Sequence, residues 1–282
     1  MPELPEVETI KRDLEKIIPG KKIVEVCVYD PRVIREPAPA VFKKSLEGAA
    51  IKNILRRGKL LIFELSNGKA LTIHLKMTGQ LVLRQKLSIN PEPVEGLVYP
   101  GEGKKATVTF RLSGGKALDF NDQRLFGELR LVNDWKKLKF VQGLGPEPFD
   151  LTCVDFKAML SKKKTKIKPL LMDQGFISGI GNLYAAEILF RAKINPERSS
   201  QGLTGREKET LYQEIKQVLS SAIKHGGSSV DDYVRLSGKP GDYARLHQVY
   251  GREGKPCFVC KAVIQRIVQG GRGTYFCPKC QK

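Results

Sequence analysis

The chain has 282 residues, which is enough for two domains with separate cores. Hydrophobic residues make up 41% and charged residues 28%, a balance typical of a soluble globular protein and not of a membrane-spanning one. The net charge of +19 indicates a polyanionic partner, and nucleic acid fits better than a membrane surface because no basic amphipathic membrane helix is evident. The first 20 residues are rich in charge, so we predict no signal peptide and a cytoplasmic location.

The N-terminus combines a proline amine with a carboxylate. An initiator methionine before proline is usually removed in bacteria, which would leave Pro2 as the first residue and Glu3 as the second. An α-amino group has a pKa of about 7.7–8.0, against about 10.4 for lysine, so a useful fraction is a neutral nucleophile at pH 7. A secondary amine that attacks a sugar aldehyde carbon forms an iminium, an electron sink for elimination. A retained Met1 would block this chemistry, and the alternative is that Pro2 only starts a helix.

The first half of the chain predicts one helix followed by short strands. Apolar residues at three- and four-residue spacings predict an amphipathic helix over 5–18, ended by Pro19-Gly20. Strands over 59–65 and 71–75 are joined by Asn67-Gly68, a hairpin signal. A second hairpin is predicted over 106–120, and residues 86–105 have the Pro and Gly content of a long mobile loop.

The second half predicts helices and then a metal site. Helices fit residues 156–160, 183–191 and 207–224, and the stretch after them is rich in glycine. Two Cys-x2-Cys pairs then stand 16 residues apart at the C-terminus: Cys257, Cys260, Cys277 and Cys280. Four thiolates at this spacing suit one structural Zn²⁺, and four protein ligands leave no open position for catalysis. The segment between the pairs predicts a β-hairpin with a glycine-rich tip that carries a single cation.

The opening string Pro-Glu-Leu-Pro-Glu-Val-Glu-Thr closely resembles the start of the bacterial formamidopyrimidine-DNA glycosylases, and matching motifs recur to the C-terminus. The resemblance implies a bifunctional base-excision repair enzyme, a DNA glycosylase and AP lyase for oxidised purines such as 8-oxoguanine and formamidopyrimidines. It assigns the nucleophile to Pro2 and the acid/base to Glu3. The sister endonuclease VIII group, which acts on oxidised pyrimidines, usually starts Pro-Glu-Gly-Pro, so Leu4 favours the purine group.

The resemblance also names DNA contacts in the first half of the chain. It assigns phosphate binding to Lys59 and His74. An enzyme that extrudes a base leaves a hole in the duplex, which apolar side chains commonly fill. Met77 suits this role because it lies at the end of a predicted hairpin, where core packing should be weak. By the same resemblance, Arg124 bonds the orphaned cytosine and Phe126 wedges between base pairs, although the family usually has a polar or basic residue where this chain has Leu125.

Further contacts are expected in the second half. Lys163 belongs to a lysine-rich run that would attract a phosphate backbone. Asn182 follows two glycines at a helix start, and the resemblance assigns it to the phosphate beside the lesion. The resemblance also implies that Arg272, at the hairpin tip, contacts phosphates and assists the second of two eliminations that cut the strand. Lys105 stands where many relatives have His-x-His-Val, and it could contact a phosphate as a point charge. Residues 226–241 resemble the lesion-recognition loop.

The expected fold class is α+β with two domains, an N-terminal antiparallel β-sandwich flanked by helices and a C-terminal helix–two-turns–helix domain with a zinc-ribbon hairpin. The expected boundaries are a catalytic domain over 1–132, a linker over 133–150, the DNA-binding helices over 151–224, the loop region over 225–250 and the zinc finger over 251–282. The expected partner is double-stranded DNA with an oxidised purine, bound by a monomer associated with the nucleoid and not with a membrane. The alternatives are an endonuclease VIII-like enzyme and a non-catalytic zinc-containing DNA-binding protein.

Overall fold

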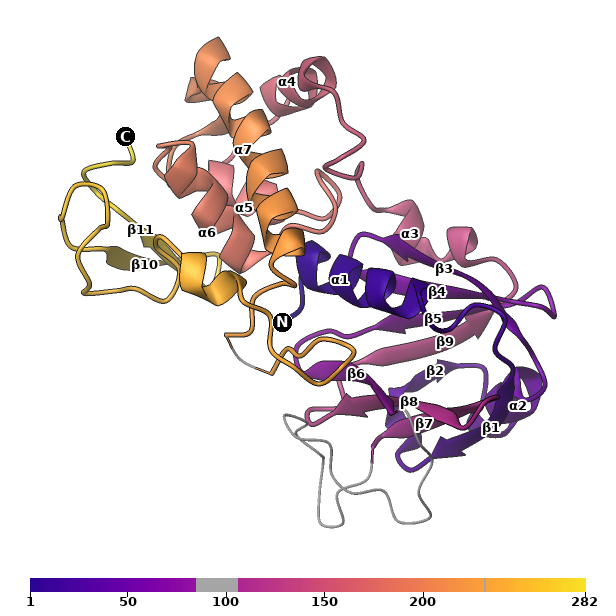
Figure 1. Cartoon of the computed structure of the whole chain (residues 1–282). Helices are drawn as coiled ribbons and strands as arrows, with labels where there is room; N and C mark the ends of the chain where they lie inside the picture. Colours follow the sequence, from indigo (N-terminus) through magenta and orange to yellow (C-terminus); the bar gives the residue numbers. More distant parts are fainter. Residues whose placement is uncertain (85–105, 231) are drawn as a thin grey trace. The chain divides into compact units, whose positions relative to one another are not determined.

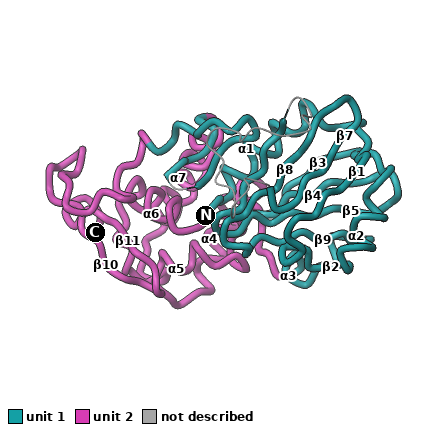
Figure 2. Tube along the Cα trace, turned by 90° about the horizontal axis from the view of Figure 1, so that it is seen from below, with its two compact units in different colours: residues 1–142, 225–244 teal, residues 143–224, 245–282 magenta. Residues whose placement is uncertain are grey.

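A computed structural model of the chain describes residues 1–84, 106–230 and 232–282 (Figure 1). The chain divides into two compact units (Figure 2). The first unit contains residues 1–142 and 225–244, and the second contains 143–224 and 245–282. The glycine-rich segment after the last long helix therefore divides between the units, because its first 20 residues pack with the N-terminal unit and the rest with the C-terminal one.

The first unit is a β-sandwich with short helices. Its strands are β1 (Ile23–Val28), β2 (Ile34–Glu36), β3 (Ile51–Arg57), β4 (Leu60–Leu65), β5 (Ala70–His74), β6 (Gly79–Arg84), β7 (Val108–Leu112), β8 (Lys116–Asp122) and β9 (Glu128–Val132). Its helices are α1 (Leu4–Glu15), α2 (Pro39–Leu46) and α3 (Lys139–Gln142), with 3₁₀ turns η1 (Pro31–Val33) and η2 (Trp135–Lys137). The sheets have the orders β1-β7-β8-β6 and β2-β9-β5-β4-β3.

The core of this unit lies between α1, α2 and the two sheets. Val7, Ile10 and Leu14 recur on one face of α1 and are fully buried, which is why the three-and-four spacing forms a helix here. The predicted α1 and both predicted hairpins, β4–β5 and β7–β8, are confirmed. The sheets are antiparallel as expected except at one edge, where β2 pairs with β9 in parallel.

Two connections carry the chain from one sheet to the other. Residues 75–78 join β5 to β6, and residues 123–127 join β8 to β9. His74 at the end of β5 pairs with Glu128 at the start of β9, and Gly79 at the start of β6 pairs with Asp122 at the end of β8. Both connections therefore lie at the same end of the strands. Met77 follows β5, the second strand of the predicted hairpin, so it lies at the end of that hairpin as expected, and its loop links the two sheets.

Both crossings depend on a glycine at a tight approach. A Cβ on Gly79 would lie 2.4 Å from the carbonyl oxygen of Leu75, and a Cβ on Gly127 would lie 2.5 Å from the ring of Phe120. Such distances are shorter than any side chain tolerates, so the backbone can turn this sharply only at glycine.

The second unit is helical with a terminal hairpin. Its elements are α4 (Cys153–Ser161), α5 (Ile167–Met172), α6 (Asn182–Arg191), the 3₁₀ turn η3 (Ser200–Gly202), α7 (Gly205–Lys224), β10 (Gln265–Gln269) and β11 (Arg272–Phe276). A further 3₁₀ turn, η4 (Tyr243–Leu246), spans the boundary between the units. The predicted helices and the C-terminal hairpin are confirmed, with Gly270 and Gly271 at the hairpin tip.

The structure also adds elements that the sequence pattern had not indicated. Helix α2 interrupts the predicted strand region, and η2 and α3 lie in the segment expected to be a linker.

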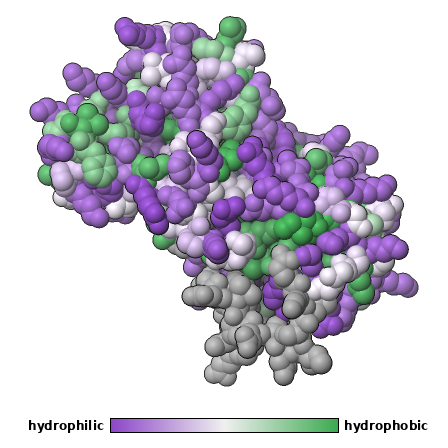
Figure 3. All heavy atoms as spheres, in the orientation of Figure 1, coloured by the Kyte–Doolittle hydropathy of each residue, from purple (hydrophilic) through white to green (hydrophobic). Residues whose placement is uncertain are grey.

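The face seen in Figure 3 is mostly hydrophilic. Within the described ranges, no helix combines the length and the apolar character that a membrane crossing requires.

Candidate active site and nucleic-acid interface

The N-terminus is fixed by hydrogen bonds at the start of α1. Pro2 and Glu3 are buried, and Glu3 is the N-cap of the helix. Glu3 and Glu6 form a capping box, in which the backbone N–H of Glu3 donates to Glu6 Oε2 at 2.8 Å and the Glu3 side chain accepts from the backbone of Glu6. These reciprocal bonds satisfy two free N–H groups of the helix and hold the peptide that joins Pro2 to Glu3.

Glu6 also connects the helix start to the predicted lesion-recognition loop. Its Oε1 accepts a hydrogen bond from the backbone N–H of Ser228 at 2.8 Å. Gly227 approaches so closely that a Cβ there would lie 3.0 Å from Glu6 Cγ and 2.9 Å from the ring of Tyr233. The loop therefore lies against the residues that carry the candidate nucleophile. No sequence pattern indicates this contact, because Glu6 and Ser228 are 222 positions apart in the chain.

Lys59 lies in the turn between β3 and β4, which is anchored to α1. An ion pair of 2.8 Å joins Arg56 of β3 to Glu8 of α1, and Arg56 also donates to the carbonyl of Gly58 at 2.8 Å. Lys59 itself is buried, with 9% of its surface exposed. Leu60, the next residue, pairs with His74 across β4 and β5. The two residues expected to bind phosphate, Lys59 and His74, are thus neighbours in the structure.

His74 is held as a neutral imidazole. Burial, together with the cations Lys76 and Lys59, lowers the pKa of His74 to about 3. Its Nδ1 accepts a hydrogen bond from the backbone N–H of Lys76 at 3.0 Å. In the neutral ring the other nitrogen then carries the hydrogen, so Nε2 is a donor. A neutral N–H donor beside a lysine ammonium is suited to a phosphate oxygen without adding a second buried charge.

The depressed pKa of His74 predicts acid sensitivity of the first unit. Between pH 6.5 and about 3, the unfolded chain binds a proton at His74 and the folded chain does not, so stability falls as the pH decreases through this range. The free energy of unfolding of His74→Gln should therefore fall less steeply on acidification than that of the unmodified protein, with a difference of up to about 1.4 kcal/mol per pH unit. Urea unfolding followed by the fluorescence of Trp135, the single tryptophan, reports on this unit. If the stability of the unmodified protein and that of His74→Gln fell equally with pH, His74 would be excluded as the cause of the acid sensitivity.

Met77, Arg124 and Phe126 come together on the two crossings. Met77 and Phe126 are 44% and 47% exposed, so both apolar side chains are accessible to solvent. Arg124 Nη1 lies 3.5 Å from Met77 Sδ, and its guanidinium lies 4.7 Å from the centre of the Phe126 ring. Leu125, between them, points back to the core and takes a positive φ of 56°. The structure therefore presents a cation between two exposed apolar side chains at one edge of the sandwich.

In the second unit, Asn182 is bound to a buried lysine that sequence reasoning missed. Lys168 is 1% exposed, and its Nζ donates to Asn182 Oδ1 at 2.6 Å and to Thr274 Oγ1 at 2.8 Å. Asn182 Nδ2 in turn donates to the carbonyl of Gly273 at 3.1 Å. These bonds join α5, the N-terminus of α6 and β11. Lys168 belongs to the lysine-rich run expected to attract phosphate, and no local pattern separates this buried lysine from the exposed ones.

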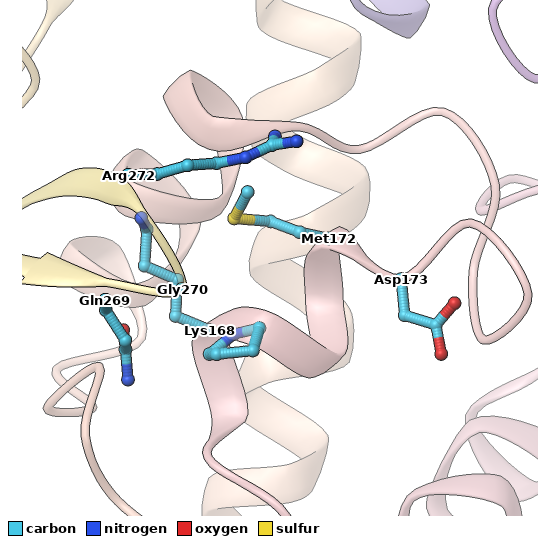
Figure 4. Close-up of a pocket in the computed structure, with 7 residues that line it drawn as sticks. Lys168, Met172, Asp173, Gln269, Gly270 and Arg272 are labelled. Carbon is cyan, nitrogen blue, oxygen red and sulfur yellow. The ribbon is translucent and has the colours of Figure 1, made fainter.

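The other candidate cations differ in exposure and place. Lys163 is exposed, and the backbone around it is ordered by a bond of 2.5 Å from Ser200 Oγ to its carbonyl. Arg272 is exposed at the start of β11 and lines a pocket with Lys168 and Met172. In Figure 4 its side chain extends beside Met172, whereas the carboxylate of Asp173 points away. Lys105 lies outside the described residues.

The C-terminal cysteines have the geometry of a zinc site. The Sγ atoms of Cys257, Cys260, Cys277 and Cys280 all lie within 4.8 Å of one another. Sulfur separations of 3.4 Å and 3.9 Å bracket the value of about 3.8 Å that a tetrahedral Zn–S₄ centre requires with bonds of about 2.3 Å. The donor set and spacing fit one structural zinc ion with no open position, and the zinc finger holds such an ion.

The metal site also forms part of the core of the second unit. Cys257 and Cys277 are buried in one apolar cluster with Ile264 of the zinc finger and Phe190 of α6. The buried carboxylate of Glu187, also on α6, accepts the backbone N–H groups of residues 248–250 at 2.8 to 3.0 Å. Desolvation by this burial raises the pKa of Glu187. The zinc ribbon is therefore attached to the helix that starts with Asn182.

Three family models match the chain in sequence order. They are described as the formamidopyrimidine-DNA glycosylase N-terminal domain (residues 1–129), the formamidopyrimidine-DNA glycosylase H2TH domain (144–234) and the zinc finger found in FPG and IleRS (254–282). Formamidopyrimidine-DNA glycosylases from Bacillus cereus and Pelotomaculum thermopropionicum are 39% and 43% identical to the chain, covering all of it and 99% of each relative. The chain belongs to the formamidopyrimidine-DNA glycosylase family.

Solved structures of the family match the fold of the chain. A Lactococcus lactis Fpg mutant in complex with DNA containing Fapy-dG is 38% identical, with a TM-score of 0.88 and full coverage of both chains. A complex of Lactococcus lactis Fpg with DNA containing an abasic site is 37% identical, with a TM-score of 0.87 over 99% of each chain. The α+β fold with a terminal zinc finger expected from the sequence is therefore confirmed as that of the glycosylase family.

Proposed function

We propose that this member of a base-excision repair glycosylase family excises oxidised purines from double-stranded DNA and then cleaves the strand as an AP lyase. The observation that carries the proposal is the N-terminus itself. Pro2 and Glu3 follow Met1 directly before a helix start, and the capping box formed by Glu3 and Glu6 holds the peptide between them. A nucleophile and an acid/base on consecutive residues require such a fixed backbone, because catalysis depends on alignment with the reacting carbon.

The proposed chemistry begins once Met1 has been removed. The nitrogen of Pro2 attacks C1′ of the damaged nucleotide, the bond from C1′ to the base breaks, and the base leaves. Glu3 donates a proton to the sugar ring oxygen as the ring opens, which leaves a C1′ iminium. The iminium accepts the electrons released by loss of a C2′ proton, so the 3′ phosphate departs by β-elimination. A δ-elimination then expels the 5′ phosphate, and both strand ends carry phosphate.

The proposed phosphate contacts come from both units. Lys59 supplies an ammonium and His74 a neutral N–H donor in the first unit. Asn182, held by Lys168, and the exposed cations Arg272 and Lys163 supply contacts in the second unit. Arg272 would neutralise a departing phosphate during the second elimination. The high net charge of +19 agrees with a phosphate-led interface.

The proposed wedge consists of Met77, Arg124 and Phe126. Enzymes that extrude a base must fill the space it leaves, and exposed apolar side chains do this in many DNA-bending proteins. Met77 and Phe126 have the required exposure, and the Arg124 guanidinium beside them can donate to the orphaned base. Arginine is well suited to this contact, since its planar donors match the acceptors of a base edge.

Borohydride trapping tests the function directly. An iminium between the Pro2 nitrogen and C1′ is reduced to a stable amine, so the protein should become covalently attached to a duplex that carries 8-oxoguanine opposite cytosine. Peptide mapping should place the attachment at the N-terminus. The protein must first be shown to have lost Met1 and to hold zinc.

Repeating the trapping with other lesions separates the proposed function from the two alternatives, an endonuclease VIII-like enzyme and a non-catalytic DNA-binding protein. Trapping on an oxidised pyrimidine in preference to both purine lesions would assign the chain to endonuclease VIII-like specificity. Binding without an adduct on any lesion or on an abasic site would refute the enzyme and leave a zinc-containing DNA-binding protein.

A further inference from the structure

Asp122 occupies the centre of the two crossings between the sheets. It is the last residue of β8 and is completely buried. Its Oδ1 accepts hydrogen bonds from Thr78 Oγ1 at 2.5 Å and from the backbone N–H of Arg124 at 3.2 Å. Its Oδ2 accepts the backbone N–H of Gly127 at 2.5 Å. A buried carboxylate is costly unless its oxygens are satisfied, and here donors from both loops satisfy it.

The donors are placed at the three exposed residues of the wedge. Thr78 follows Met77, the donor N–H of Arg124 belongs to the wedge residue itself, and Gly127 follows Phe126. One carboxylate is therefore bonded at or next to each member of the wedge. The hydroxyl of Thr78 lies 3.3 Å from the Arg124 backbone nitrogen as well, which connects the two loops directly.

The same loops contain strained backbone. Lys76, just before Met77, has a φ of 52°, and Leu125, between Arg124 and Phe126, has a φ of 56°. Side chains rarely adopt this left-handed region, and such residues persist only when their surroundings hold them there. The hydrogen bonds to Asp122 provide that restraint at the ends of both segments.

We propose that Asp122 is a positioning residue that holds Met77, Arg124 and Phe126 ready to enter the duplex. The proposal rests on the wedge function proposed above. Free loops would have to lose conformational freedom during insertion, whereas loops held by Asp122 have lost it beforehand. Its effect should therefore appear only on substrates that must be opened, because a completely buried side chain cannot reach the DNA or the reacting sugar.

Asp122→Asn tests the proposal with little change in volume. The amide keeps one acceptor oxygen, but its NH₂ group would face a donor N–H from Arg124 or Gly127, so at least one loop contact is lost. Cleavage of 8-oxoguanine is measured in an intact duplex and compared with cleavage of an abasic site in single-stranded DNA, which has no orphaned base. We expect at least tenfold greater loss on the duplex, accompanied by reduced 2-aminopurine fluorescence from a reporter placed beside the lesion.

Asp119→Asn is the matched control. Asp119 is a buried carboxylate of the same strand, but it accepts from Arg84 and Thr109 and has no bond to either crossing. Its substitution should affect both substrates equally. If Asp122→Asn does not fold, Thr78→Val, which removes one donor, should show the same selective loss with a smaller amplitude.

Equal loss of activity by Asp122→Asn on both substrates, or no loss on either, would overturn the positioning role. An unmodified protein that cleaves neither substrate would instead refute the proposed function. The two failures are therefore distinguishable.

Discussion

Pro2→Gly is expected to lose strand cleavage while its affinity for duplex DNA is retained. Glycine keeps a terminal amine but lacks the ring that fixes the nitrogen. Because misplacement of a catalytic group is costly, we expect the rate of strand cleavage to fall about a hundredfold or more. Burial of Pro2 behind the capping box means that even a small displacement of the nitrogen misaligns it with C1′. Single-turnover cleavage and binding to uncleaved duplex should be measured on the same preparation.

A second variant separates the amine from the ring. An N-terminal extension that cannot be removed converts the Pro2 amine into an amide and leaves the proline side chain in place. An amide nitrogen cannot form an iminium, so borohydride trapping should disappear completely, whereas Pro2→Gly should retain a trace. Undiminished cleavage by the extended chain would refute the amine mechanism.

Cys277→Ser is expected to lose both zinc and DNA binding. Structural zinc contributes about 10–16 kcal/mol in small zinc domains, and a ribbon of this size has little other core. Cys277 is fully buried beside Ile264 and Phe190, and its backbone N–H is bonded to Gln281 Oε1 at 2.8 Å. Without the metal the hairpin should unfold and release Arg272. Colorimetric zinc release and duplex binding measured by anisotropy report the two losses, with affinity reduced at least tenfold.

The loss should extend beyond the ribbon. Thr274 and Gly273 of β11 bond Lys168 and Asn182, so unfolding of the hairpin also removes partners from the N-terminus of α6. Cys153→Ser is the control, because Cys153 is in the same unit but is not part of the four-cysteine cluster. It should keep zinc and affinity. A zinc-free Cys277→Ser protein that binds duplex normally would contradict the link between ribbon and interface.

Local patterns were sufficient to predict much of this architecture. The spacing of Val7, Ile10 and Leu14 determines α1 because burial on one face is the dominant energy of a short helix. Asn67-Gly68 predicts its hairpin because a tight turn needs positive φ, which Gly68 has. The cysteine pairs predict the metal site because ligand spacing is a local property.

What could not be predicted depends on contacts between distant segments. Met77 is predicted to follow a hairpin, but the sequence pattern does not show that its loop leads into the other sheet, because strand partners are not encoded in either strand alone. Lys168 looks like its neighbours in a basic run, and only its bonds to Asn182 and Thr274 explain its burial. The position of Asp122 as an acceptor for two loops depends on the pairing of β6 with β8, which the sequence around Asp122 does not indicate.

The division of the first unit along the chain has a consequence for its biosynthesis. Residues 225–244 complete this unit, and the bond from Ser228 to Glu6 spans 222 positions. Because a ribosome delivers the chain from its N-terminus, the sandwich emerges long before the segment that finishes it, whereas α4 to α7 emerge in between. The N-terminal end of α1 must therefore wait, without the contact from Ser228, until four-fifths of the protein has been translated. A nascent or truncated chain that stops before residue 225 has the sandwich strands but lacks the contact that closes over its N-terminus.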